Sequence, residues 1–137
     1  MSESVLSSCL ENYPIDRKTK SDEKMIVGGT WNTTAFYAST CSKMERRIKR
    51  VKQLITNMDF FSLQETHSTP ERASALEQTF SNHTFFYSHG TLARGGLAVC
   101  TRNHFLSNFR SIAWKEIEKG RVAVLELRGR HGSLDII

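Results

Sequence analysis

The sequence predicts an α/β layered fold (α+β sandwich), with a mixed β-sheet flanked by helices. From residue 25 onward, strand-like and helix-like apolar patterns alternate twice, and a run of strand-like segments follows. Alternating strands and helices favour parallel neighbouring strands, and consecutive strands favour antiparallel ones, so we expect a mixed sheet. The chain has 137 residues, of which 39% are hydrophobic and 24% are charged, as is usual for one globular domain.

Residues 1–24 show no sustained apolar period, and we expect a flexible leader there. The first residues lack the basic segment of a secretory signal, and no apolar run approaches the roughly 20 residues that a membrane helix needs. The three cysteines, Cys9, Cys41 and Cys100, are far apart and show no metal-binding spacing. We therefore expect an intracellular protein without membrane association.

The first strand is predicted over residues 25–31, where Gly28 and Gly29 mark a bulge or a close approach of the backbone. The first helix is predicted to begin at Ser42, because Ser42 and Glu45 have the spacing of a capping box. Apolar residues then recur at helical intervals and form one stripe: Met44, Ile48, Val51, Ile55 and Met58.

Residues 59–64 form the second predicted strand, which runs into a polar loop. The second helix is predicted to follow Thr69, with Pro70 at its first position. Cys100 lies in an apolar run, which indicates a buried core residue. Four further segments have strand-like patterns: residues 83–88, 96–101, 121–127 and 133–137.

Most of the excess positive charge lies in the first predicted helix. Residues 43–52 contain six basic side chains and one acidic side chain, a balance of +5 that equals the net charge of the whole chain. One interpretation is the solvated outer face of an amphipathic helix. The other is direct contact with nucleic-acid phosphates, for which Arg46 and Arg50 share a face.

Residues 63–67 (LQETH) are the most informative for chemistry. Glu65 follows a predicted buried strand, so its carboxylate would project from a sheet edge, where ligands of α/β sheets bind. A carboxylate suits Mg²⁺, which takes one or two protein carboxylates and completes its coordination with water and phosphate oxygens. The alternatives are that Glu65 caps the following helix or pairs with an arginine.

Three segments together resemble the endonuclease/exonuclease/phosphatase superfamily. They are Trp31-Asn32, Leu63-Gln64-Glu65-Thr66-His67 and Gly95-Gly96-Leu97-Ala98-Val99, in that order. The resemblance covers residues 25–137, and residues 63–67 are most similar to the endonuclease domains of LINE-type (non-LTR) retrotransposons. It implies the first half of a deoxyribonuclease-like four-layer fold. It also implies a Mg²⁺-dependent (or Mn²⁺-dependent) hydrolase that cleaves phosphodiester bonds in nucleic acid, with DNA as the expected partner.

The resemblance also implies roles for individual residues. Glu65 would be the metal-binding carboxylate, and both Glu65 and Asn32 would be catalytic, with Asn32 orienting the metal site and the attacking water. His67 belongs to the same segment, and it either contacts nucleic acid or is a loop histidine without a catalytic role. The family often has a second polar ligand shortly after the asparagine, where this sequence has Thr33 and Thr34.

The later motifs of the family, a Tyr, an Asp-x-Asn pair and a Ser-Asp-His triplet, are not found in these 137 residues. We therefore expect residues 25–137 to form an incomplete domain that is inactive alone. A C-terminal half or a reverse transcriptase would belong to the full-length protein, which would be nuclear if it acts on chromosomal DNA. Two alternatives remain open. One is a catalytically dead retroelement remnant or polyanion-binding module, and the other is a phosphatase or lipid phosphodiesterase of the same superfamily.

Overall fold

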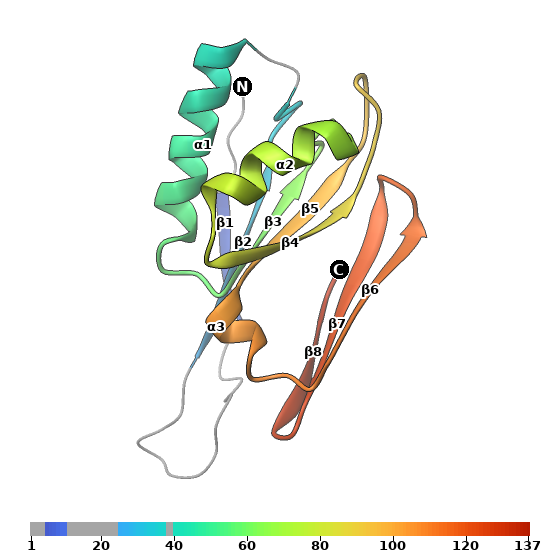
Figure 1. Ribbon diagram of the computed structural model, residues 1–137. Coiled ribbons are helices and arrows are strands. Elements are labelled where there is room, and N and C mark those ends of the chain that lie inside the picture. The colour runs from blue at the N-terminus through green and yellow to red at the C-terminus, as the bar shows by residue number, and fades with distance from the viewer. Residues whose placement is uncertain (1–4, 11–24, 38–39) are drawn as a thin grey trace.

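A computed structural model describes residues 5–10, 25–37 and 40–137 of the chain (Figure 1). Within these residues, eight strands form two sheets and three segments are helical. The strands are β1 (Val5–Leu10), β2 (Ile26–Asn32), β3 (Phe60–Gln64), β4 (His83–Ser88), β5 (Leu97–Arg102), β6 (Ser111–Glu118), β7 (Val122–Gly129) and β8 (Gly132–Ile136). The helices are α1 (Cys41–Ile55), α2 (Pro70–Thr79) and α3 (Asn103–Leu106). No helix of the described part is long and apolar enough to cross a membrane.

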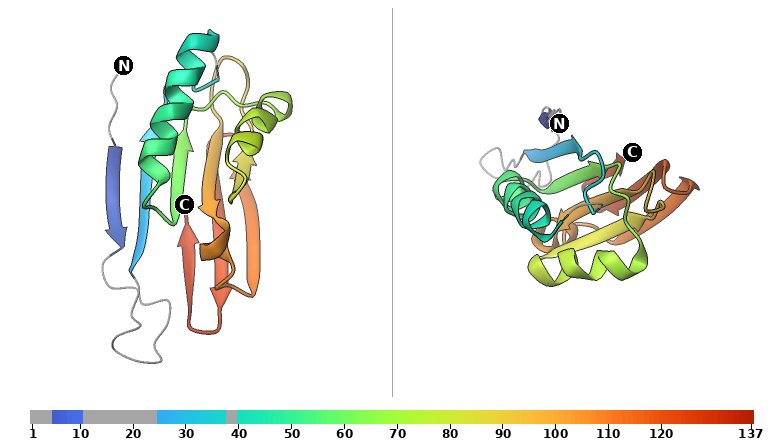
Figure 2. Two further views of the ribbon diagram at one scale, coloured as in Figure 1. Left: turned by 60° about the vertical axis from the view of Figure 1, so that its left-hand side comes forward. Right: turned by 90° about the horizontal axis from the view of Figure 1, so that it is seen from above.

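The molecule is layered, and the five-stranded sheet is its middle layer (Figure 2). Its strand order is β1-β2-β3-β5-β4, in which β2 and β3 are parallel and the other neighbours are antiparallel. Helices α1 and α2 cover one face, and the antiparallel sheet β6-β7-β8 covers part of the other. The predicted layered fold with a mixed sheet is therefore confirmed.

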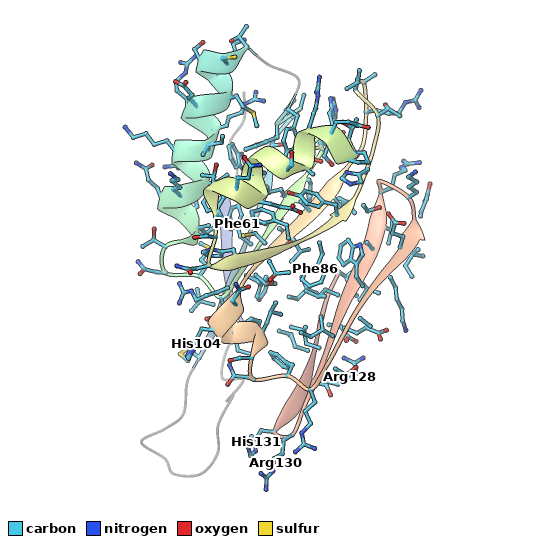
Figure 3. The ribbon with its side chains drawn as sticks, in the orientation of Figure 1. Phe61, Phe86, His104, Arg128, Arg130 and His131 are labelled. Carbon is cyan, nitrogen blue, oxygen red and sulfur yellow. The ribbon has the colours of Figure 1, made fainter. Side chains whose placement is uncertain are left out.

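Two apolar cores lie on opposite faces of the middle sheet, because successive side chains of a strand point in opposite directions. Phe61 is fully buried in the core under α1 and α2, whereas Phe60 and Phe86 belong to the core between the sheets (Figure 3). Cys100 is buried in the first core, as expected. Burial raises the pKa of its thiol to about 12, so the thiolate needed of a nucleophile is disfavoured.

The structure differs from the predicted leader over residues 5–10. This segment forms β1, which pairs antiparallel with β2 from Val5 opposite Trp31 to Leu10 opposite Ile26. Because backbone groups at the edge of β2 require partners, tertiary pairing overrides a weak local pattern. The rest of the predicted leader, residues 1–4 and 11–24, lies outside the described residues.

Helix α1 forms as predicted, but the predicted capping box is wrong. The helix begins at Cys41, and its N-cap residue is Thr40, which makes no side-chain capping hydrogen bond. The chain thus enters the helix before Ser42, whose hydroxyl lies 3.3 Å from that of Thr40. The predicted apolar stripe faces the sheet, with Val51 and Ile55 buried, because this face covers the apolar core.

The other predicted elements are confirmed, and besides β1 two further elements were missed. Helix α2 follows Thr69, and the middle-sheet strands β2 to β5 lie close to their predicted positions. A Cβ atom at Gly28 would collide with the ring of Phe60, and the β2–β3 register is uninterrupted. These glycines therefore permit a close approach rather than a bulge. Strand β6 and the short α3 escaped prediction because β6 is largely exposed and α3 is one turn long.

The lowered pKa of His83 predicts that acid destabilises the folded protein. Burial and the guanidinium of Arg102, directly opposite on β5, lower this pKa below its usual 6.5. The folded state favours the neutral ring, so protonation favours unfolding, and stability should fall as the pH drops below 6.5 toward the lowered pKa. We expect His83→Gln to weaken the pH dependence of the urea unfolding midpoint between about pH 7.5 and 5.5. An unchanged dependence would exclude this role for His83.

Candidate active site

Asn32 and Glu65 come from neighbouring strands that end at the same edge of the middle sheet. Asn32 is the last residue of β2 and stands opposite Gln64 in the parallel register, and Glu65 follows Gln64 directly. Both residues line one pocket of about 480 Å³, here called the inter-sheet pocket, whose other wall includes Trp114 and Arg121. The structure thus brings together the two residues for which the sequence resemblance implied catalytic roles.

The backbone at this edge is fixed by hydrogen bonds that continue beyond the strands. The amides of Thr33, Ala35 and Tyr37 donate to the carbonyl oxygens of three successive residues, at 2.8 to 3.1 Å, beginning with Gln64 at the end of β3. In the described part of the chain, four non-glycine residues have positive φ, and all lie in these two segments: Thr34, Ala35, Glu65 and His67. Such backbone costs about 1–3 kcal/mol per residue and is concentrated at functional sites, which makes this edge the leading candidate.

Thr33 is the first of the two threonines that follow Asn32, where the superfamily that the sequence resembles often has a second polar ligand. Its side chain is fully buried, and its hydroxyl can donate to the carbonyl oxygens of Gln64 at 3.0 Å and Glu65 at 3.1 Å. The hydroxyl therefore supports the backbone that carries Glu65 and is turned away from the pocket.

Thr33→Val retains the shape of this side chain and removes its hydroxyl. We expect the free energy of unfolding to fall by about 1–2 kcal/mol, because the carbonyl oxygens of Gln64 and Glu65 lose a buried hydrogen-bond donor. Urea denaturation measures this loss, and Thr34→Val, at an exposed neighbour, is the control. Equal stability of wild type and Thr33→Val would show that the hydroxyl does not support the loop.

The Glu65 carboxylate is held on one side and open on the other. Its Oε2 atom accepts a hydrogen bond from the amide of Gly95 at 3.2 Å and lies 3.6 Å from Nε2 of His67. The side chain is half exposed, and Oε1 makes no hydrogen bond within the described ranges. The N-cap of α2 is Thr69, and no described arginine pairs with Glu65, so neither alternative role of Glu65 is observed.

The oxygen groups at this edge suit Mg²⁺ or Mn²⁺. Among the described residues they do not form a closed metal centre, in which protein side chains supply every ligand. Nowhere in residues 5–10, 25–37 and 40–137 do three His, Cys, Asp or Glu side chains gather closely enough to hold a metal ion. One carboxylate and one amide group that line the same pocket suit a cation that retains water and binds substrate phosphate. The Asn32 amide oxygen accepts a hydrogen bond from the amide of Thr34 at 3.2 Å, which sets its direction.

The other candidate contact residues occupy different environments. The His67 ring is largely buried beside Glu65, and its Nδ1 atom has no hydrogen-bond partner in the described structure. Arg46 and Arg50 are exposed on α1, which covers the opposite face of the middle sheet from the inter-sheet pocket (Figure 2). Their contact with nucleic acid stays a prediction.

Two helix arginines hold the loop that follows Asn32. Arg47 of α1 donates to the carbonyl oxygens of Ala35 and Phe36, the latter at 3.0 Å. Arg72 of α2 donates to the carbonyl oxygen of Tyr37 at 2.9 Å. Part of the basic charge of α1 is therefore used within the fold.

Comparison with solved structures identifies the fold. No protein-family model and no curated protein sequence matches this chain. A humanized D. rerio TDP2 carrying 14 mutations is similar at a TM-score of 0.52 with 13% identity, over 77% of this chain and 45% of that chain. The chain shares the fold of TDP2. D. rerio TDP2 complexed with a single-strand DNA product also matches, at a TM-score of 0.49 with 13% identity, over 74% of this chain and 41% of that chain.

The shared fold confirms the predicted layered arrangement of a mixed sheet and helices, whereas membership of the superfamily that the sequence resembles stays a prediction. The present chain spans less than half the length of the TDP2 chains that it matches. At 13% identity the similarity establishes the fold alone, and the chemistry of the site depends on this chain's own residues.

A second hollow adjoins Glu65, and sequence reasoning missed it. This loop pocket, of about 450 Å³, lies between the β4–β5 loop and the β6–β7 turn. Its lining includes Glu65, one histidine and three basic side chains: His89, Arg94, Lys119 and Arg121. Because β6 was not predicted, the turn at residues 119–121 could not be placed, although a glycine between two basic residues is a turn signal.

Proposed function

We propose that this chain carries part of the active site of a metal-dependent hydrolase that cleaves phosphodiester bonds in nucleic acid. Glu65 would bind Mg²⁺ or Mn²⁺, and Asn32 would orient the groups around it. The observation that carries the proposal is the placement of these two side chains at one sheet edge, lining one pocket, on a backbone with four positive-φ residues.

Glu65, Gly95 and Asn32 have different proposed roles at the site. The Gly95 amide fixes Oε2 of Glu65, while Oε1 is available for a cation. The cation, when bound, supplies positive charge that neutralises the charge developing on the phosphate. The Asn32 amide, directed by its hydrogen bond with Thr34, can orient a water molecule or a phosphate oxygen in the inter-sheet pocket.

The sequence and the fold support the same proposal. The fold is that of TDP2, and residues 63–67 resemble LINE-type endonuclease domains. A LINE-type origin, DNA as the substrate and action on chromosomal DNA in the nucleus belong to this proposal. The chain spans 45% of the TDP2 chain, so the activity of a whole enzyme is also part of this proposal.

The proposal is tested by the effect of Mg²⁺ on binding of a short, fluorescein-labelled single-stranded oligonucleotide, followed by fluorescence anisotropy. At constant ionic strength, Mg²⁺ normally weakens such complexes because it competes for the phosphates. We expect Mg²⁺ to strengthen binding to the wild-type chain, because a cation held by Glu65 would supply positive charge that attracts a phosphate. Glu65→Gln should show the opposite response. Weakening by Mg²⁺ in both proteins would contradict the proposal.

A polyanion-binding module is the second candidate function. It is favoured by the basic side chains of the loop pocket. It is also favoured because Glu65 is the one carboxylate side chain that the described residues contribute to either pocket. In that case the chain would bind oligonucleotides through Coulomb attraction alone. Mg²⁺ would then weaken binding to the wild type and to Glu65→Gln to the same extent.

A further inference from the structure

We propose that the loop pocket binds a backbone phosphate next to the phosphodiester held at Glu65, so that the substrate is a nucleic-acid strand rather than a small phosphate ester. This inference rests on the proposed function of Glu65. It assigns substrate-positioning roles to Arg94 and Lys119, which the sequence resemblance did not single out.

The charge around the loop pocket suits an anion. Arg94, Lys119 and Arg121 line it, and the latter two come from the β6–β7 turn. Arg121 is partly neutralised by Glu118, since Nη1 of Arg121 lies 3.3 Å from Oε1 of Glu118. Arg94 and Lys119 are exposed and form no ion pair with the described residues, so they are the groups whose charge is available to a phosphate.

The β4–β5 loop holds its side of the pocket in a defined shape. The amide of Thr91 donates to the carbonyl oxygen of Arg94 at 2.8 Å. The Thr91 hydroxyl accepts hydrogen bonds from the amides of Ala93 and Arg94 at 3.2 and 3.1 Å. His89 is fixed by the hydroxyl of Ser68, 3.1 Å from its Nδ1.

The β6–β7 turn is tied to the same loop. The amide of Gly120 donates to the buried hydroxyl of Ser88 at 2.7 Å, and the amide of Gly96 donates to the carbonyl oxygen of Gly120 at 2.8 Å. Gly120 packs so closely that a Cβ atom there would lie 3.0 Å from the carbonyl oxygen of His89. Lys119 and Arg94 are therefore presented from two segments with a fixed relative position.

Glu65 connects the two pockets, because it lines both. Two phosphates bound on either side of one carboxylate must be close together, as neighbouring phosphates of a strand are. A small ester with one phosphate can fill only one of the pockets. The Glu65 charge also repels an anion in the loop pocket until a cation neutralises it, which couples occupation of the two pockets.

The test measures binding of the labelled single-stranded oligonucleotide in EDTA, where the cation at Glu65 cannot contribute. The variant is Arg94→Ala/Lys119→Ala in the full chain. We expect its affinity to fall roughly fivefold to tenfold at low salt, and the slope of log affinity against log salt to become shallower by about 1.4. Arg94→Lys/Lys119→Arg keeps both charges and should bind like the wild type.

The matched control is Lys52→Ala/Arg130→Ala. It also removes two exposed positive charges, but from the last turn of α1 and from the β7–β8 turn, where Arg130 lies at the opposite end of β7 from the loop pocket (Figure 3). It should reduce binding less than twofold, or about 0.4 kcal/mol. The proposal is overturned if the wild type does not bind, or if the control loses as much affinity as Arg94→Ala/Lys119→Ala.

Two further arms separate this inference from related possibilities. Inorganic phosphate, at the same phosphate concentration as unlabelled oligonucleotide, should displace the label much less effectively. Equal displacement would identify a site for a lone phosphate and overturn the strand proposal. Glu65→Gln in EDTA should bind the oligonucleotide at least as tightly as wild type, because a negative charge is removed. Failure of the Mg²⁺ response thus tests Glu65, and failure of the Arg94→Ala/Lys119→Ala effect tests the loop pocket.

Discussion

Replacing Glu65 with glutamine is expected to lower the affinity of the chain for Mn²⁺ by about tenfold or more. The substitution preserves size and the hydrogen bond from the Gly95 amide, and it removes the charge that attracts the cation. Asn32 is the other protein group proposed at this site, so the carboxylate supplies its only full negative charge. The electron paramagnetic resonance signal of free Mn²⁺, followed during titration with protein, measures the affinity.

Two matched variants make this result specific. Glu77→Gln removes an exposed carboxylate from α2 and should leave Mn²⁺ binding unchanged. Asn32→Asp adds a second carboxylate to the inter-sheet pocket and should raise the affinity, since Mg²⁺-type sites use one or two carboxylates. Equal affinity of wild type and Glu65→Gln, or equal losses in Glu65→Gln and Glu77→Gln, would remove Glu65 from the site.

Gly96→Ala is expected to lower the free energy of unfolding by about 2–4 kcal/mol. Gly96 has φ +97°, which L side chains rarely adopt. A Cβ atom there would collide with Oγ1 of Thr66 and lie 3.0 Å from the amide nitrogen of His67. Both neighbours are held by the loop that carries Glu65, so the clash cannot be relieved by a flexible side chain.

Gly95→Ala is the control for this substitution. Gly95 also has positive φ, at +72°, but the atom nearest to its added Cβ would be the carbonyl oxygen of Gly120 at 3.1 Å. We expect a smaller loss of stability, so the difference between the two variants isolates the clash with Thr66 and His67. Urea denaturation measures both. Comparable losses would show that backbone strain alone sets the cost at Gly96.

Elements whose apolar residues follow a regular pattern were predictable from the sequence. The stripe of α1 and the apolar segment of β3 follow from the requirement to bury one side of a helix or both sides of a central strand. Strand β1 was not predictable in this way, because its formation depends on the open edge of β2. Strand β6 carries exposed apolar residues such as Ile112 and Ile117, so its pattern does not indicate a buried face.

The candidate site was predictable only in part. Glu65 could be proposed because it follows a predicted buried strand, and Asn32 because the resemblance implied a role for it. The structure then places both at one edge of the middle sheet. The contact between the Gly95 amide and Glu65 joins residues 30 positions apart, and no local pattern encodes it. The loop pocket likewise depends on a turn and a loop that come together only in the folded chain.

The most direct test is a Mn²⁺ titration followed by amide nuclear magnetic resonance, because a paramagnetic ion broadens the signals of nearby nuclei. The amide of Gly95 donates to the proposed ligand, so its signal should broaden first, together with those of Thr66 and His67. Signals from the β7–β8 turn at the other end of the molecule should stay sharp at the same Mn²⁺ concentration. Uniform broadening, or broadening centred on another part of the chain, would contradict cation binding at Glu65.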